Sequence, residues 1–89
     1  IIGFPSEKET EFEETLEFVT NAGIDLGTAI KFSCKKGTEA ENIEPKVNPK
    51  EIDRRFRYAR RYFKRKGYSV IYLPRLHYFV FYRRERYSV

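Results

Sequence analysis

The side chains that most often carry catalysis are scarce in this sequence, and their spacing forms no catalytic group. Cys34 is the only cysteine and His77 the only histidine among 89 residues. A lone cysteine usually packs as a small hydrophobic residue. His77 lies inside an aromatic run, with no Cys or carboxylate at the spacing of a metal motif. We therefore expect both side chains to pack, and the sequence contains no acid–base or metal-binding pattern.

Recognition of a polyanion is a second kind of chemistry, and residues 49–67 suggest it because Arg and Lys alternate there with Tyr and Phe. Arginine and lysine neutralise phosphates, and tyrosine rings stack on unpaired bases. The candidate residues for nucleic-acid binding are Arg54, Arg57, Tyr58, Arg61, Tyr62, Lys64 and Arg65. The same pattern also fits a solvated helix face that packs on an acidic partner, and both interpretations stay open.

The charges divide the chain into an acidic and a basic half. Residues 1–44 hold 4 Lys and Arg against 10 Asp and Glu, which is net −6, and residues 45–89 hold 14 against 3, which is net +11. The acidic run Glu7–Glu17 is either a solvated helix face or the internal partner of the basic helix.

The first half has the pattern of a strand, a helix and a strand. Ile1–Phe4 is an apolar run that ends at a proline, and residues 7–22 carry Phe12, Leu16 and Val19 on one helical face. Ser6 and Glu9 have the spacing of a capping box. Residues 28–33 form a second apolar run, so we expect a parallel β-α-β unit over residues 1–38.

The second half has the pattern of a loop, a basic helix and an aromatic β tail. Residues 39–48 are polar and predict a loop. Asn48 and Pro49 then begin a helix over residues 49–67, with Ile52, Phe56, Ala59 and Phe63 on its apolar face and Arg and Lys on every other face. Residues 68–89 contain two strand candidates, 68–73 and 77–82, separated by a turn, which predicts an antiparallel hairpin.

Several of these segments together resemble the radical-SAM superfamily. Gly3-Phe4-Pro5-Ser6-Glu7 is similar to the family's Gly-Phe/Leu-Pro-Gly-Glu turn, and Glu11–Phe18 is similar to the acidic helix that follows it. Phe32–Thr38 resembles the family's strand end Tyr-Ser-Pro-Arg-x-Gly-Thr. Pro49–Phe63 is more loosely similar to the segment that closes the barrel in cobalamin-binding-type members.

The resemblance implies a fold and a cofactor site. It implies α/β architecture, with strands five and six of a partial (β/α)6 barrel of the TIM type. In the family, the glycine-rich end of strand five approaches S-adenosylmethionine, and the end of strand six lies beside its adenine. The residues at matching positions are Gly3, Phe4, Pro5, Glu7, Phe32 and Ser33. Glycine allows a ligand close to the backbone, and such sheets bind ligands at the carboxyl ends of their strands.

The sequence also departs from the family in ways that affect activity. The family holds a 4Fe–4S cluster with a Cys-x3-Cys-x2-Cys loop, and one cysteine cannot replace it. The chain has no Met, and the first four barrel strands have no counterpart. We therefore expect the C-terminal part of a radical-SAM enzyme, which forms one wall of the cofactor site in its parent, is not catalytic alone and holds no cofactor by itself. Ser6 and Cys34 also differ from the family's Gly and Pro.

The alternative is a small non-catalytic module that binds nucleic acid or a protein partner through residues 49–67 and the aromatic tail. The expected partners are the N-terminal barrel of the parent, nucleic acid, or a second copy joined at an exposed strand edge at Ile1–Phe4. No apolar run approaches the length of a membrane span, so we expect no membrane partner and a cytoplasmic location. A hairpin tail that extends the sheet would favour a self-contained module, whereas an open apolar face would favour a fragment or an oligomer.

Overall fold

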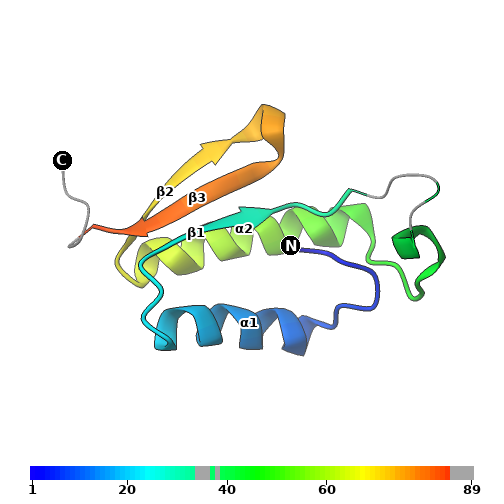
Figure 1. The fold of residues 1–89 in the computed structure, drawn as a ribbon, viewed down its shortest axis with the longest axis horizontal. Coiled ribbons are helices and arrows are strands. Elements are labelled where there is room, and N and C mark those ends of the chain that lie inside the picture. Colours follow the sequence, from blue (N-terminus) through cyan, green and yellow to red (C-terminus); the bar gives the residue numbers. More distant parts are fainter. Residues whose placement is uncertain (34–36, 38, 85–89) are drawn as a thin grey trace.

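The computed structural model describes residues 1–33, 37 and 39–84, and it contains two helices and one three-stranded sheet (Figure 1). In chain order the elements are α1 (Glu9–Asn21), β1 (Leu26–Ile30), a 3₁₀ turn (Glu39–Asn42), α2 (Pro49–Arg65), β2 (Tyr68–Leu73), a second 3₁₀ turn (Pro74–Leu76) and β3 (Tyr78–Arg83). The strand order is β1-β3-β2, and both pairings are antiparallel. The fold is therefore α/β, as predicted, but its sheet is antiparallel.

The predicted parallel pairing of Ile1–Phe4 with residues 28–33 is reduced to one bridge. Ile2 pairs with Lys31 in parallel: the Ile2 amide donates to the Ile30 carbonyl at 2.8 Å, and the Phe32 amide donates to the Ile2 carbonyl at 2.8 Å. The ladder ends there because Gly3 has a φ of +87° and Pro5 has no amide to donate. A barrel wall of two full parallel strands is thus absent from the described residues, and the predicted partial barrel stays a prediction.

The predicted hairpin of the tail is confirmed. β2 and β3 pair from Tyr68↔Arg83 to Leu73↔Tyr78, and β3 also pairs with β1. The hairpin therefore extends the sheet beyond β1. The prediction that His77 packs is wrong, because it is exposed at the turn with a left-handed φ of 55°.

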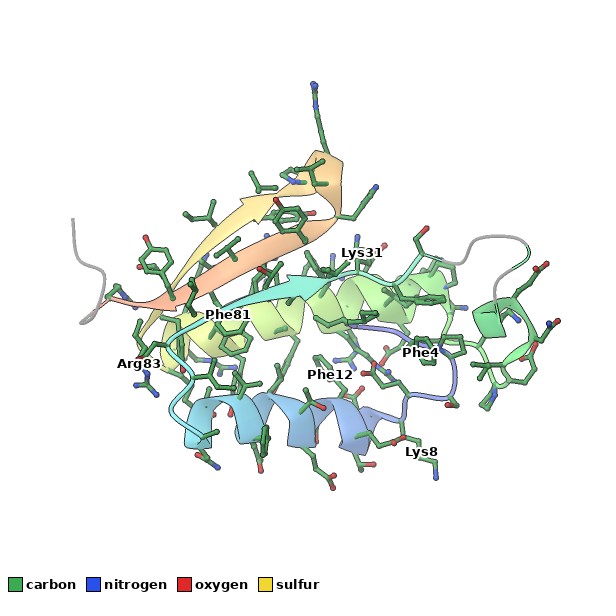
Figure 2. The ribbon with its side chains drawn as sticks, in the orientation of Figure 1. Phe4, Lys8, Phe12, Lys31, Phe81 and Arg83 are labelled. Atoms are coloured by element: carbon green, nitrogen blue, oxygen red, sulfur yellow. The ribbon has the colours of Figure 1, made fainter. Side chains whose placement is uncertain are left out.

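The apolar faces predicted for the two helices are confirmed and form the core with the sheet. Phe12 and Leu16 of α1, and Ile52, Phe56, Ala59 and Phe63 of α2, are all buried. Phe63 stacks on Phe81 of β3, with ring centroids 4.0 Å apart and an angle of 7° between the planes. Figure 2 shows Phe12 pointing into the space between α1 and α2. The core thus joins three layers: α1, α2 and the inner face of the sheet.

The start of α1 differs from the sequence prediction, whereas the start of α2 agrees with it. The predicted capping box of Ser6 and Glu9 is wrong: Ser6 has a φ of 70°, and the helix begins after Lys8, whose amide donates to the Glu11 carboxylate at 2.9 Å. At α2 the side chain of Asn48 accepts from the Lys50 amide at 2.8 Å, as an N-cap residue does.

The outer face of the sheet is apolar, and neither α1 nor α2 covers it (Figure 1). Leu26, Ile30 and Ile71 are 56%, 46% and 49% exposed, and Val80 lies between Thr28 and Ile71 in the cross-strand register. Successive residues of a strand point to opposite faces, so these side chains point away from Phe79 and Phe81, which face the core. No helix in residues 1–33 or 39–84 combines the length and apolar character needed to cross a lipid bilayer.

Candidate cofactor-binding site

One end of the molecule brings together the carboxyl end of β1 and the amino ends of both helices (Figure 1). A cavity of about 490 Å³ opens at this end, a size in the usual range of small-molecule sites. It is lined by Gly3, Pro5, Lys31, Phe32, Lys46, Val47, Asn48, Pro49, Ile52 and Asp53. Helix amino ends and strand carboxyl ends are where α/β folds most often bind ligands.

Three of the six cofactor residues predicted from the sequence line this cavity, namely Gly3, Pro5 and Phe32. Phe4 packs against Phe32 edge to face, with ring centroids 5.4 Å apart, and is 38% exposed. Figure 2 places Phe4 at the same end of the molecule as Lys31. Ser33 is exposed and lies outside the lining. The structure therefore gathers half of the predicted set in the lining of one cavity, and Phe4 packs against that lining through Phe32.

Glu7, the remaining predicted residue, lies behind the cavity wall in a network of charges. Its carboxylate accepts the Gly3 amide at 2.9 Å and the Arg55 Nη1 at 3.0 Å. Arg55 also donates through Nη1 to the Glu7 carbonyl at 3.0 Å and through Nε to Glu51 at 2.8 Å. With these contacts, Glu7 fixes the turn at Gly3 to α2.

Arg55 is the buried member of this network, and its burial could not be predicted from the sequence. Its side chain is 7% exposed, whereas the helical pattern predicted a solvated position. Burial lowers the pKa of Arg55, but hydrogen bonds to Glu51 and Glu7 outweigh that effect and raise it. Hydrogen bonds from Arg54 and Arg55 lower the pKa of Glu51 to about 2, the Arg54 bond contributing most. The network therefore stabilises the charged forms of Arg55 and Glu51.

Gly3 has a packing role as well as a place in the lining. A Cβ atom built on it would lie 2.5 Å from Cγ1 of Ile52. The backbone at Gly3 therefore approaches α2 more closely than any other residue type allows, and its left-handed φ also favours glycine.

The polar groups of the cavity were not predicted from the sequence. Lys31 pairs with Asp53 at 2.7 Å, and its hydrogen bond lowers the pKa of Asp53. Lys46 pairs with Glu44 at 3.1 Å. Ile52 and Asp53 come from the first two turns of α2, and only the packing of α2 against residues 3–5 brings them to this hollow. The sequence contains one feature that could have pointed to Asp53 as a cavity residue, namely its position directly after the core residue Ile52.

The alternative set for nucleic-acid binding lies on α2, away from the cavity. Arg54 is half-buried in ion pairs with Glu9 and Glu51. The Tyr62 hydroxyl lies 3.3 Å from Oγ1 of Thr20 on α1. The other members are exposed: Arg57, Tyr58, Arg61, Lys64 and Arg65.

The residues at the site do not fit an iron–sulfur cluster. Cys34 lies outside the described residues. Within residues 1–33 and 39–84 no group of three or more His, Cys, Asp or Glu side chains could hold a metal ion. A single cysteine cannot supply the thiolates that such a cluster needs.

Comparison with known proteins relates the chain to two kinds of enzyme. It is 40% identical over 55 residues to a tRNA-2-methylthio-N(6)-dimethylallyladenosine synthase of Buchnera aphidicola, and 42% identical over 55 residues to a ribosomal protein uS12 methylthiotransferase of Koribacter versatilis. Each match covers 62% of this chain, and it covers 12% and 11% of the relative. The synthase of Chromobacterium violaceum is 34% identical over 70 residues, which is 79% of this chain and 16% of that enzyme.

Enzymes of both kinds are radical-SAM proteins, and the matches lie in their C-terminal part. The chain belongs to the radical-SAM superfamily. It spans about one sixth or less of the length of the three relatives. No protein-family model and no solved structure matches the chain.

Proposed function

We propose that this radical-SAM chain forms one wall of an S-adenosylmethionine site in a larger methylthiotransferase-like enzyme. The observation that carries the proposal is that Gly3, Pro5 and Phe32, which the family motifs mark as cofactor residues, line a single cavity at the carboxyl end of β1. Phe32, Val47 and Ile52 offer an apolar surface for an adenine ring, and Asp53 offers an acceptor for a polar group of the cofactor.

The proposal assigns different parts of the chemistry to different parts of the protein. The 4Fe–4S cluster would be held outside this chain, and bound S-adenosylmethionine would supply the radical chemistry. The residues of this chain would bind and orient the cofactor only. The rest of the barrel would cover the outer face of the sheet, because Leu26, Ile30 and Ile71 leave an apolar surface that favours burial.

A segment exchange tests this function. The chain replaces its homologous segment in a methylthiotransferase of the matched kind, and cleavage of S-adenosylmethionine is measured. We expect the exchanged enzyme to keep its cluster and to form 5′-deoxyadenosine. Phe32→Ala should then raise the KM for S-adenosylmethionine by about tenfold, since one adenine contact of roughly 1–2 kcal/mol is lost.

The control is Phe18→Ala, which removes the same ring at a position 69% exposed on α1, and it should leave the KM unchanged. An exchanged enzyme that retains its cluster but shows equal KM values for Phe32→Ala and the unmodified sequence would contradict the proposal. The isolated chain should show no turnover and no iron–sulfur absorption after reconstitution.

A further inference from the structure

The solvent-facing side of α2 carries a row of cations that the rest of the fold does not neutralise. Residues 49–65 contain eight Lys and Arg side chains but only two carboxylates. Arg54 and Arg55 are used in ion pairs with Glu7, Glu9 and Glu51, and Arg60 stacks on the Tyr72 ring at 4.0 Å. The other five are exposed and make no ion pair with any described residue: Lys50, Arg57, Arg61, Lys64 and Arg65.

The spacing of three of these cations places them on the same face of α2. Arg57, Arg61 and Arg65 recur every four residues, so they lie on one helical face about 6 Å apart along the axis. Such a row can contact successive phosphates of one extended strand.

Tyr58 lies beside this row and is held as a fixed platform. Its ring stacks on Tyr62, with centroids 6.3 Å apart and 26° between the planes, and its other neighbour is the edge of Phe12 at 6.0 Å. The hydroxyl of Tyr62 is anchored near Thr20. Tyr58 nevertheless remains 36% exposed. A rigid, partly exposed ring loses little entropy when a planar group stacks on it.

Two basic hollows flank Tyr58. One is lined by Arg54, Arg57, Tyr58 and Arg61, and the other by Tyr58, Tyr62, Arg65 and Lys66. On the side of α1, Glu13 and Glu17 border the two tyrosines. These carboxylates repel phosphates, so a polyanion would be confined to the α2 side of Tyr58.

We infer that this face of α2 binds single-stranded nucleic acid. The cations would contact phosphates, and a base would stack on Tyr58. A duplex hides the faces of its bases, and Asp and Glu side chains have no aromatic ring to stack on Tyr58, so the combination favours an unpaired strand. The site is separate from the cofactor cavity, so its failure would not affect the proposal above.

The test is fluorescence anisotropy with a labelled ten-nucleotide oligouridylate. We expect saturable binding whose logarithmic salt dependence has a slope of about −3, from four phosphate contacts. Arg57→Gln with Arg61→Gln should weaken binding about tenfold and halve the slope. The matched control is Lys8→Gln with Arg75→Gln, which removes the same charge at exposed positions outside α2 and should cost less than threefold.

Two variants of Tyr58 separate stacking from charge. Tyr58→Phe keeps the ring and should bind as the unmodified chain does. Tyr58→Leu keeps apolar contact with Phe12 but removes the ring, and it should lose at least about fivefold in affinity. Circular dichroism confirms that each variant is folded.

Three outcomes would overturn the inference. Equal losses for the two double variants would show attraction by net charge alone. Unchanged binding by Tyr58→Leu, or equally tight binding of duplex or of polyglutamate, would show a surface for any polyanion or an acidic protein. Concentration-dependent self-association without oligonucleotide binding would show that the acidic α1 of one copy pairs with α2 of another.

Discussion

Replacing Gly3 by alanine tests whether this glycine is required by the packing of the turn. Two costs are expected. A left-handed φ of +87° costs a residue with a Cβ about 1–2 kcal/mol. The new methyl group would also lie 2.5 Å from Cγ1 and 2.9 Å from Cδ1 of Ile52, and an overlap of that kind in a packed core costs about 1–3 kcal/mol. Together these predict a loss of about 2–5 kcal/mol in the free energy of unfolding.

Gly67 provides a matched control for the first cost. Its φ is +92°, yet nothing lies within 4 Å of the Cβ position. Gly67→Ala should therefore lose only the conformational term, about 1–2 kcal/mol. Urea unfolding followed by circular dichroism measures both variants, and the difference between them isolates the contact with Ile52.

A third variant makes the test independent of whether Gly3→Ala still folds. Ile52→Ala removes the atoms that would overlap, so adding Gly3→Ala in that background should cost about as much as Gly67→Ala does. Equal losses for Gly3→Ala and Gly67→Ala in the unmodified chain, within about 0.5 kcal/mol, would refute the packing argument. In that case only the left-handed backbone conformation, and not the contact with Ile52, would require glycine at position 3.

Two further predictions concern the charge network at the start of α2. Arg55→Met should lower the unfolding free energy by about 3 kcal/mol, because it leaves Glu7 half-buried without its partner. The control Arg57→Met, on the exposed face, should change the unfolding free energy by less than about 0.5 kcal/mol. Thermal melts of both variants measure the difference. Glu51 has its pKa lowered from 4.5 to about 2, mainly by Arg54, so its stabilising contribution is present above pH 4.5 and is lost as the pH falls toward 2. Glu51→Gln should therefore reduce the fall in unfolding free energy over that pH range. If the unfolding free energy of the variant falls as steeply as that of the unmodified chain, Glu51 is not the group responsible.

Much of the local structure could be predicted from the sequence because it depends on neighbours in the chain. The spacing of Phe12 and Leu16 marked the buried face of α1, and Asn48 marked the start of α2. The hairpin of β2 and β3 followed from two short aromatic runs and a turn. The predicted cap at Ser6 failed because a left-handed φ there delays the helix to Glu9.

The charge pattern shows where such prediction stops. Residues 49–67 predicted a basic helix, but no periodicity could show which cations are neutralised. Packing decided that: Arg55 is buried among Glu7 and Glu51, whereas Arg57 and Arg61 remain exposed. Of the two interpretations of the acidic run, the one in which it pairs with the basic helix is confirmed. The pairing is made by Glu7 and Glu9, at the start of α1.

The sequence by itself determined the helices, the hairpin, the apolar faces and the radical-SAM motifs around Gly3 and Phe32, because each depends on residue type and short spacing. Only the tertiary structure decided which strand β1 pairs with, since alternating apolar residues mark a strand but not its partner or direction. β1 pairs antiparallel with β3, and Ile2 adds one parallel bridge. The cavity likewise depends on Ile52 and Asp53 reaching residues 3–5 across the fold, a contact between distant residues that local chemistry does not specify.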